Sequence, residues 1–346
     1  MNQSVIYALG AAVLFGASTP FAKLLTGDLP PVLLAGLLYL GSGLGLALVR
    51  VVRDGGLKPS GIPLNEWPWL LGAVLFGGVL GPVALMLGLH STSGATASLL
   101  LNLEAVLTAV IAWWVFKENA DRRIVGGMLA IVAGGIALGW QTGSPWQPGG
   151  TGSWLVGLAC LCWAIDNNLT RKVSASDALF VASIKGLIAG SVNTTLAISM
   201  GAAWPSWATL SATMAVGLLG YGLSLVLFVL ALRGLGTART GAYFSTAPFM
   251  GVVVSLLVFS EPTSWVFWMA AALMGLGVWL HLTEHHSHEH QHEALEHEHE
   301  HEHDEHHQHA HGVEHRGSGK HSHRHTHLPL KHTHPHYPDI HHRHVH

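Results

Sequence analysis

The chain has 346 residues, a formal net charge of −3 and a mean hydropathy of +0.38. Only 11% of its residues are charged, whereas a soluble globular protein carries about 25%, so this composition excludes a water-soluble globular chain. The polar residues are also unevenly distributed, because all but one of the 27 histidines follow Leu280.

Ten apolar runs follow one another before the histidine-rich end. They lie near residues 4–25, 31–52, 68–89, 94–116, 123–141, 153–172, 178–200, 208–232, 238–260 and 265–282. A bilayer core of about 30 Å needs about 20 apolar residues per helix. The N-terminus, MNQSVIYALG, has no basic region and no clear cleavage site, so we interpret the first run as a retained span. The sequence predicts an all-α integral membrane protein with ten transmembrane helices.

Basic residues outside the histidine-rich end gather in alternate loops between these runs. They are Arg50, Arg53 and Lys58; Lys117, Arg122 and Arg123; Arg171 and Lys172; Arg233 and Arg239. The positive-inside rule places such loops in the cytoplasm. Both termini are then cytoplasmic, as an even number of spans also requires. We expect a multi-pass protein of the cell's inner (plasma) membrane.

Two stretches of the chain, 95–118 and 238–261, resemble each other and close on Val-Phe-Lys-Glu and Val-Phe-Ser-Glu. Aligned without gaps, they share Ala95/Ala238, Val110/Val253, Val115/Val258, Phe116/Phe259 and Glu118/Glu261. Such similarity indicates an internal repeat. Each copy contains five spans, so the second enters the membrane from the opposite side. We predict two inverted five-helix repeats, 1–142 and 150–282, and a disordered His-rich cytoplasmic tail, 283–346.

The first helices of the two copies turn polar at the same internal position. Superposition places residues 15–20 (FGASTP) on 163–168 (WAIDNN), and Lys23 on Arg171. Inverted repeats bind substrate near the middle of the membrane, where corresponding helices are interrupted by polar or Pro/Gly residues. We expect the site at these positions.

Three motifs carry a resemblance to a known family. A Phe-Gly or Trp-Ala pair lies early in the first helix of each copy, TSGATASLLLNLEA (92–105) leads to FKE (116–118), and Lys185-Gly186-Leu187 lies in the seventh span. These motifs resemble the EamA branch of the drug/metabolite transporter superfamily, over about residues 4–282. The resemblance implies a ten-helix secondary transporter, most often an exporter of amino acids and other metabolites. Two residues depart from the pattern: Ala105 replaces a common Pro, and Leu38 a common Arg.

Three charged residues lie well inside predicted spans, away from the span ends, where each costs about 3 kcal/mol. Glu104 lies near the middle of the fourth span. As an unpaired carboxylate it would bind a cation or carry a proton; otherwise it is a hydrogen-bonded packing residue. Asp166 and Lys185 lie at matching depths in neighbouring spans, so a salt bridge is feasible, either as a structural brace or as a gate.

Several uncharged polar and small residues have two interpretations each. The amides Asn102, Asn167, Asn168 and Asn193 either contact substrate or join helices, and Tyr221 and Tyr243 are weaker substrate candidates. Small residues four apart indicate close helix packing, within the bundle or between two subunits of a homodimer. Cys160 and Cys162 point to different faces of one helix, so we interpret them as packing residues and not as a disulfide.

The tail has no helical periodicity, because histidines alternate with Glu, Gln, Arg, Thr and Pro; such a sequence cannot form a packed core. Its imidazoles can wrap around Zn²⁺, Ni²⁺, Co²⁺ or Cu²⁺. The expected ligands are His297, His299, His301, His303, His321, His323, His325 and His327. A solvated tail with incidental metal affinity and a pH sensor are the other interpretations.

The sequence favours a secondary transporter that exports small organic metabolites, such as amino-acid or drug-like solutes, by alternating access. The main candidates for substrate recognition or coupling are Glu104, Asp166, Lys185, Asn102, Asn168 and Tyr221. One alternative is a transporter of Ni²⁺, Co²⁺ or Zn²⁺ with the tail as cytoplasmic metal collector, and another is a metal-sensing or storage protein. We expect no enzyme, no required cofactor and no nucleic-acid partner; the expected partners are the bilayer, a solute and divalent metal ions.

Overall fold

The computed structural model describes two groups of residues. In the membrane part they are 3–56, 62–116, 122–141, 151–173, 176–228, 230–231, 240 and 243–282, and in the tail they are 287–292, 295–301, 321–327 and 330–335. The chain divides into two compact units, Met1–Glu284 and His285–His346.

Helical residues coincide with every apolar run of the sequence. The first copy contains α1 (Gln3–Leu25), α2 (Pro31–Asp54), η1 (Leu64–Glu66), α3 (Trp67–Ala73), η2 (Val74–Leu80), α4 (Gly81–Ser91), α5 (Gly94–Leu100), α6 (Asn102–Phe116) and α7 (Arg122–Gln141). The second contains α8 (Thr151–Thr170), η3 (Arg171–Val173), α9 (Ala178–Ser199), α10 (Trp207–Gly217), η4 (Leu218–Leu223), α12 (Ala247–Phe259) and α13 (Trp265–Leu282).

Not all of these helices are equally suited to cross a membrane. Six stretches are long and apolar enough: Gln3–Leu25, Pro31–Asp54, Leu64–Ser91, Gly94–Val115, Ala178–Ser199 and Trp207–Phe228. Three shorter apolar helices are Val125–Trp140, Ala247–Phe259 and Trp265–Leu280. The 20-residue α8 is in neither group and carries Asp166 and two asparagines. The described membrane part is therefore all-helical with several candidate spans, and ten as the number of spans stays a prediction.

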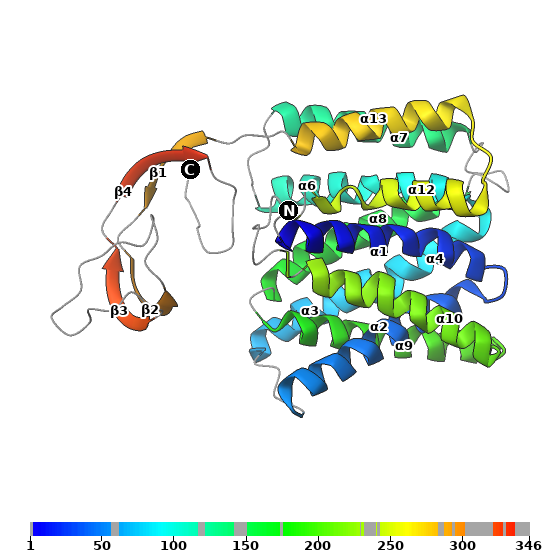
Figure 1. Cartoon of the computed structure of the whole chain (residues 1–346), viewed down its shortest axis with the longest axis horizontal. Helices are drawn as coiled ribbons and strands as arrows, with labels where there is room; N and C mark the ends of the chain where they lie inside the picture. The colour runs from blue at the N-terminus through cyan, green and yellow to red at the C-terminus, as the bar shows by residue number, and fades with distance from the viewer. Residues whose placement is uncertain are drawn as a thin grey trace. The chain divides into compact units, whose positions relative to one another are not determined.

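Equivalent helices of the two copies lie side by side and run in opposite directions. In Figure 1, α2 packs on α9 at one edge of the bundle and α7 packs on α13 at the other. Gly36 lies against Thr194 and Gly43 against Gly186, so α2 and α9 are antiparallel. The copies also exchange contacts, because α1 packs on α12 while α8 packs on α5 and α6. This arrangement is that of an inverted repeat.

Glycines bring the backbones of α2 and α9 into contact. A Cβ atom on Gly186 would lie 2.6 Å from the Cα and N atoms of Gly43, and one on Gly190 would lie 2.6 Å from the N atom of Leu40. No side chain fits at such distances, and close approach of this kind is how membrane helices gain packing contacts. These glycines therefore serve packing within the bundle, and a homodimer stays a prediction.

An ionic cluster joins α2 and α9 at the end of the bundle where α1 begins, which we call the N-terminal face. The Arg53 Nη2 and Arg50 Nε atoms lie 2.6 and 3.2 Å from Asp177 Oδ2. The Asp177 carboxylate also accepts a hydrogen bond from the Leu179 N–H and so caps α9. The hydrogen bond from Arg53 is the main reason that the pKa of Asp177 falls to about 2. The carboxylate therefore stays charged at any physiological pH.

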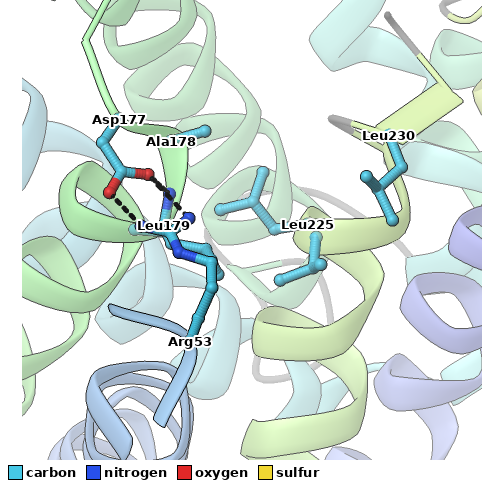
Figure 2. Close-up of a pocket in the computed structure, with 8 residues that line it drawn as sticks. Arg53, Asp177, Ala178, Leu179, Leu225 and Leu230 are labelled. Carbon is cyan, nitrogen blue, oxygen red and sulfur yellow. Dashed lines mark hydrogen bonds and ion pairs between the residues drawn. The ribbon is translucent and has the colours of Figure 1, made fainter. Parts of the chain in front are cut away.

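A small cavity of about 140 Å³ adjoins this ionic cluster (Figure 2). The guanidinium of Arg53 and the carboxylate of Asp177 form one side of it, and Leu179, Leu225 and Leu230 form an apolar side. Because the two guanidinium groups of Arg50 and Arg53 pair with the two carboxylates of Asp54 and Asp177, the charges of this cluster balance beside the cavity. We interpret the cluster as a brace between α2 and α9.

The described segments of the tail are strands. β1 (Ser287–His292) pairs antiparallel with β4 (Leu330–Pro335), and β2 (Leu295–His301) pairs antiparallel with β3 (His321–His327). This differs from the expectation of a disordered tail. Alternation of histidine with a second residue type has the period of a β-strand, so backbone pairing is possible without a packed core. His303 lies outside the described residues, and metal binding by the tail stays a prediction.

Substitution of Gly186 by valine tests the packing of α2 on α9. The new side chain would overlap the backbone at Gly43, and overpacking of this kind costs about 1–3 kcal/mol or more. We expect a lower unfolding temperature of the detergent-solubilised protein. Gly157→Ala on α8 is the control, because a Cβ atom there meets nothing within 4 Å. Equal unfolding temperatures for the two variants would contradict this account.

Candidate functional site

The helix widens into a π-helix at equivalent places in the two copies. η2 lies between α3 and α4, and η4 follows α10. Gly77 in η2 and Gly220 in η4 have the spacing that separates Ala95 from Ala238, so the two segments correspond. Short π-helical segments inside longer helices occur frequently at functional sites. They mark the middle of the bundle as the place to search for one.

Side chains from other helices bind the carbonyl groups of η2. The Tyr39 hydroxyl and the Trp163 Nε1–H both donate to the Gly77 carbonyl, at 2.7 and 3.0 Å, and Asn193 donates to the Gly78 carbonyl at 3.2 Å. A carbonyl that leaves the regular helical ladder must find a donor inside the protein, because lipid offers none. Helices α2, α8 and α9 are thereby joined to the π-helical segment.

Asp166 lies directly against η2. A Cβ atom on Gly77 would be 1.8 Å from Asp166 Oδ2, so only glycine fits there. In the other copy, a Cβ atom on Gly220 would be 2.3 Å from the Cβ of Ser18, the residue that superposes on Asp166. We call these two contacts, each between a π-helix glycine and the first helix of the other copy, the two joints. They share one geometry, but one carries a carboxylate and the other a hydroxyl.

The predicted ion pair is present between α8 and α9. Lys185 Nζ lies 2.6 and 2.7 Å from the two carboxylate oxygens of Asp166, and the Thr170 hydroxyl donates to Asp166 Oδ1 at 2.8 Å. Both charged side chains are largely buried. Two direct contacts and a third hydrogen bond compensate part of the cost of removing these charges from water.

Glu104 has a partner that the sequence did not reveal. The Asn167 side chain donates to Glu104 Oε1 at 2.9 Å and to the Thr108 hydroxyl at 3.3 Å. Of the two interpretations of Glu104, the structure shows a hydrogen-bonded carboxylate, and its role in coupling or cation recognition stays a prediction. The side chain of Glu104 is half-buried and that of Asn167 is exposed. Both side chains can therefore be reached from outside the packed core. One carboxylate accepts about four hydrogen bonds, which leaves capacity for a ligand.

The fourth span is broken just before Glu104. α5 ends at Leu100, Leu101 is a turn, and α6 begins at Asn102, so Glu104 occupies the first turn of α6. The interruption is a single residue, since Leu101 keeps right-handed helical angles (φ −60°, ψ −17°) and Gly94–Val115 is one candidate span. The equivalent span of the second copy also starts a new helix, α12, near the matching place, with Pro248 in its first turn. The first helices α1 and α8, where we expected the interruption, are continuous.

The other predicted amides join helices or close turns. Asn102 donates to the Leu99 carbonyl, and the buried Asn168 donates to the Ala164 and Thr108 carbonyls. These bonds use the side-chain N–H groups of the three buried amides, while the side-chain oxygen of Asn193 is buried without a hydrogen-bond partner. Of the four amides, Asn167 is the one whose geometry suits a solute.

Aromatic side chains adjoin the group of Glu104, Asp166 and Lys185, which we call the charged centre. The rings of Tyr39 and Tyr221 are 5.5 Å apart, and Phe15 lies 6.0 Å from Tyr221. The hydroxyl of Tyr39 interacts electrostatically with the carboxylates of Asp166 and Glu104. Carboxylates beside aromatic faces form an environment that stabilises a cation.

Charge in this centre is unbalanced. Asp166 is paired with Lys185, whereas the Glu104 carboxylate is bound by the Asn167 amide, so the described residues at this place include two carboxylates and one ammonium group. Cys160 and Cys162 are free thiols, and Cys160 contacts the Leu100 carbonyl. Among the described residues, no three His, Cys, Asp or Glu side chains are grouped to hold a metal ion.

A duplicated, antiparallel helical bundle with charged groups at its centre defines the class of membrane transporters built from inverted repeats. The model of the EamA-like transporter family matches residues 2–140 and 150–283. The chain therefore belongs to the EamA-like transporter family, and each copy corresponds to one match.

Similar proteins agree with this assignment. An uncharacterized transporter of Methanothermobacter thermautotrophicus is 24% identical over 299 residues, 80% of this chain and 84% of that protein. The uncharacterized transporter YyaM of Bacillus subtilis is 24% identical over 293 residues, 79% of this chain and 91% of YyaM. A probable 4-amino-4-deoxy-L-arabinose-phosphoundecaprenol flippase subunit, ArnE of Pseudomonas paraeruginosa, is 43% identical over 77 residues, 22% of this chain and 64% of ArnE.

A solved crystal structure shares the fold. It aligns with a TM-score of 0.61 at 19% identity and covers 80% of this chain and 94% of that chain. The likeness extends over both copies and not over one half alone, since its share of the chain exceeds one repeat. At this identity it supports the architecture only.

A double-mutant cycle tests the ion pair between α8 and α9. Asp166→Asn leaves the buried Lys185 ammonium without its carboxylate, and Lys185→Gln leaves the buried Asp166 carboxylate without its ammonium. Each single change should lower the free energy of unfolding by about 3–5 kcal/mol. The double variant Asp166→Asn/Lys185→Gln removes both charges. We expect it to unfold in detergent at a higher temperature than either single variant. Additive losses in the double variant would mean that the two side chains do not act as a pair.

Proposed function

We propose that the chain is a secondary transporter of small organic solutes that carry an ammonium group, with Glu104 as the residue that binds it. The observation that carries this proposal is the pairing of the charged groups: Asp166 is bound to Lys185, whereas the second carboxylate, that of Glu104, is bound by the neutral amide of Asn167. A bound cation restores neutrality in a region of low dielectric constant. The family and the named transporters among its relatives support transport rather than catalysis.

The geometry suggests how binding of a solute at Glu104 affects the position of α8. Asn167, which donates to Glu104, is next to Asp166 on α8, and Asp166 holds both Lys185 and η2. A change at Glu104 that moves Asn167 therefore displaces α8, to which the ion pair is attached. Competition between a proton and the ammonium group for one carboxylate gives exchange of the two. Export of metabolites such as amino-acid or drug-like solutes is what the family resemblance implies.

We place the protein in the inner (plasma) membrane with the N-terminal face in the cytoplasm. Arg50, Arg53 and Lys172 lie at this face, as the positive-inside rule requires of a cytoplasmic side. The same orientation puts the histidine-rich tail in the cytoplasm. The distribution of basic residues supports this orientation, and the cavity beside Arg53 has no bearing on it.

A second proposal concerns the tail, which we infer binds divalent transition metals. Histidine at every second position over 297–303 and 321–327 supplies imidazoles at a density that suits Zn²⁺, Ni²⁺, Co²⁺ or Cu²⁺. The tail then buffers or collects metal in the cytoplasm. A metal as the cargo itself is the less favoured alternative, because the described centre offers carboxylates and an ammonium group instead of imidazoles.

Glu104→Gln tests the cation site. The amide keeps the volume and one acceptor oxygen but removes the charge, and a charged hydrogen bond contributes about 1.5–3 kcal/mol, which is about ten- to a hundredfold in affinity. We expect uptake of organic amines into inverted vesicles to fall by that factor, with normal protein levels in the membrane. Glu66→Gln, in η1 at the N-terminal face, is the matched control. Unchanged amine flux in Glu104→Gln would remove Glu104 from the mechanism.

Truncation after Leu282 separates metal binding from solute transport. We expect the shortened protein to lose Ni²⁺ and Zn²⁺ binding, measured by calorimetry on purified protein, while amine flux in vesicles is kept. If truncation instead abolishes metal flux and neither form moves an organic solute, then metal is the cargo. Metal binding that persists without the tail would contradict the second proposal.

A further inference from the structure

The glutamate that closes the second copy of the repeat has a structural partner in the first copy. Glu261 follows α12 directly after Ser260, which has φ 48° and ψ 40°. Ser260 is the one non-glycine residue with positive φ in the described part of the chain. A left-handed conformation is strained for serine and persists where the surroundings hold it in place. Here it turns the chain so that Glu261 points back to the bundle.

The Glu261 carboxylate binds the start of α5. Its two oxygens accept hydrogen bonds from the Gly94 and Ala95 N–H groups, at 2.8 and 2.7 Å. Both N–H groups belong to the first turn of a helix, where they have no partner within the helix. The bonds are charge-assisted, because a carboxylate meets the positive end of a helix dipole. A residue of the second copy thus holds a helix of the first.

Close packing surrounds this contact. A Cβ atom on Gly94 would lie 2.9 Å from the Ser255 hydroxyl of α12 and 3.1 Å from Glu261 Oε1. Nearby, Lys23 at the end of α1 donates to the Leu89 and His90 carbonyls at the end of α4. This end of the bundle, opposite the N-terminal face, is therefore closed by contacts within the first copy and between the two copies.

α8 joins the same closure. A Cβ atom on Gly152, in its first turn, would lie 2.0 Å from the Thr92 hydroxyl in the turn between α4 and α5. α5 leads through the break at Leu101 directly into Glu104, and α8 carries Asn167. α5, which precedes the helix of Glu104, and α8, which carries Asn167, thus both begin at the end of the bundle where Glu261 binds.

We propose that Glu261 is a positioning residue for transport, a latch that holds the end opposite the N-terminal face closed. Opening of this end to release or admit solute requires α5 and α12 to separate, and this breaks both hydrogen bonds of Glu261. The inference rests on the proposed transport function for its role in the cycle, but the latch itself is a property of the protein without solute. Glu118, which aligns with Glu261 in the first copy, lies outside the described residues and has no part in the proposal.

Cysteine accessibility tests the latch without any substrate. Ser98, on α5 one turn after Gly94, is fully buried, and a Cβ atom on Gly251 of α12 would lie 2.4 Å from its hydroxyl. The reporter is Ser98→Cys in the full chain with Cys160→Ala and Cys162→Ala, labelled in vesicles by a membrane-impermeant maleimide. The control reporter is Ser183→Cys, buried in α9 near the N-terminal face.

We expect Glu261→Ala to speed the labelling of Ser98→Cys about tenfold or more from the face opposite the N-terminus, since it removes two charged hydrogen bonds and each corresponds to about tenfold. Labelling of Ser183→Cys should not change. Glu261→Asp keeps the charge on a shorter side chain and should restore part of the protection. This partial rescue distinguishes a latch from general destabilisation.

Two outcomes would overturn the proposal. One is equal labelling of Ser98→Cys with and without Glu261, and the other is a parallel rise at Ser183→Cys, which would mean that the whole bundle loosens. The transport assay is independent of this result. If Ser98→Cys responds as expected but no organic amine is moved by the parent protein, the latch stands and the proposed solute is wrong.

Discussion

Backbone carbonyl groups in a lipid environment must find hydrogen-bond donors inside the protein, and the centre of this bundle depends on that constraint. Where η2 departs from the α-helical ladder, Tyr39, Trp163 and Asn193 supply the donors. Those three side chains come from three different helices. The π-helical segment therefore decides which helices must meet, and it places Asp166 against Gly77.

The interfaces of the bundle divide into two kinds. α2 and α9 touch backbone to backbone through glycines and are braced by Arg53 and Asp177 at one end. Contacts of this kind do not slide without large overlap, so we regard α2 and α9 as a fixed pair. The contacts of α5 with α12 and of α6 with α8 include hydrogen bonds of charged side chains as well as close packing, at Glu261 and at Glu104. Polar contacts can be exchanged for others, and motion between the two copies is easiest there.

The sequence predicted the helices, the duplication and the pairing of Asp166 with Lys185. Each of these follows from a one-dimensional property: hydrophobic length, similarity at fixed spacing, and depth of a charge along a helix. The helix breaks did not follow. We expected interruptions in the first helix of each copy, but they occur before Glu104 and near Pro248, and the π-helices surround glycines at 77–78 and 220–222. The signals were present as Pro248 and the paired glycines, but which carbonyl finds a donor is decided by helices that are distant in sequence. The partner of Glu104 was missed for the same reason.

The two joints at Gly77 and Gly220 share one geometry and differ in charge, since Asp166 stands in one and Ser18 in the other. An assembly of two separate identical copies could not achieve this. Both of its joints would carry serine and leave the centre without an ion pair, or both would carry aspartate and bury twice the charge. Fusion of the copies into one chain releases them from this choice. After fusion, one half can keep a neutral joint that packs well while the other half acquires charge. A single polypeptide can therefore have different chemical groups in its two halves, which symmetric dimers of half-length chains cannot.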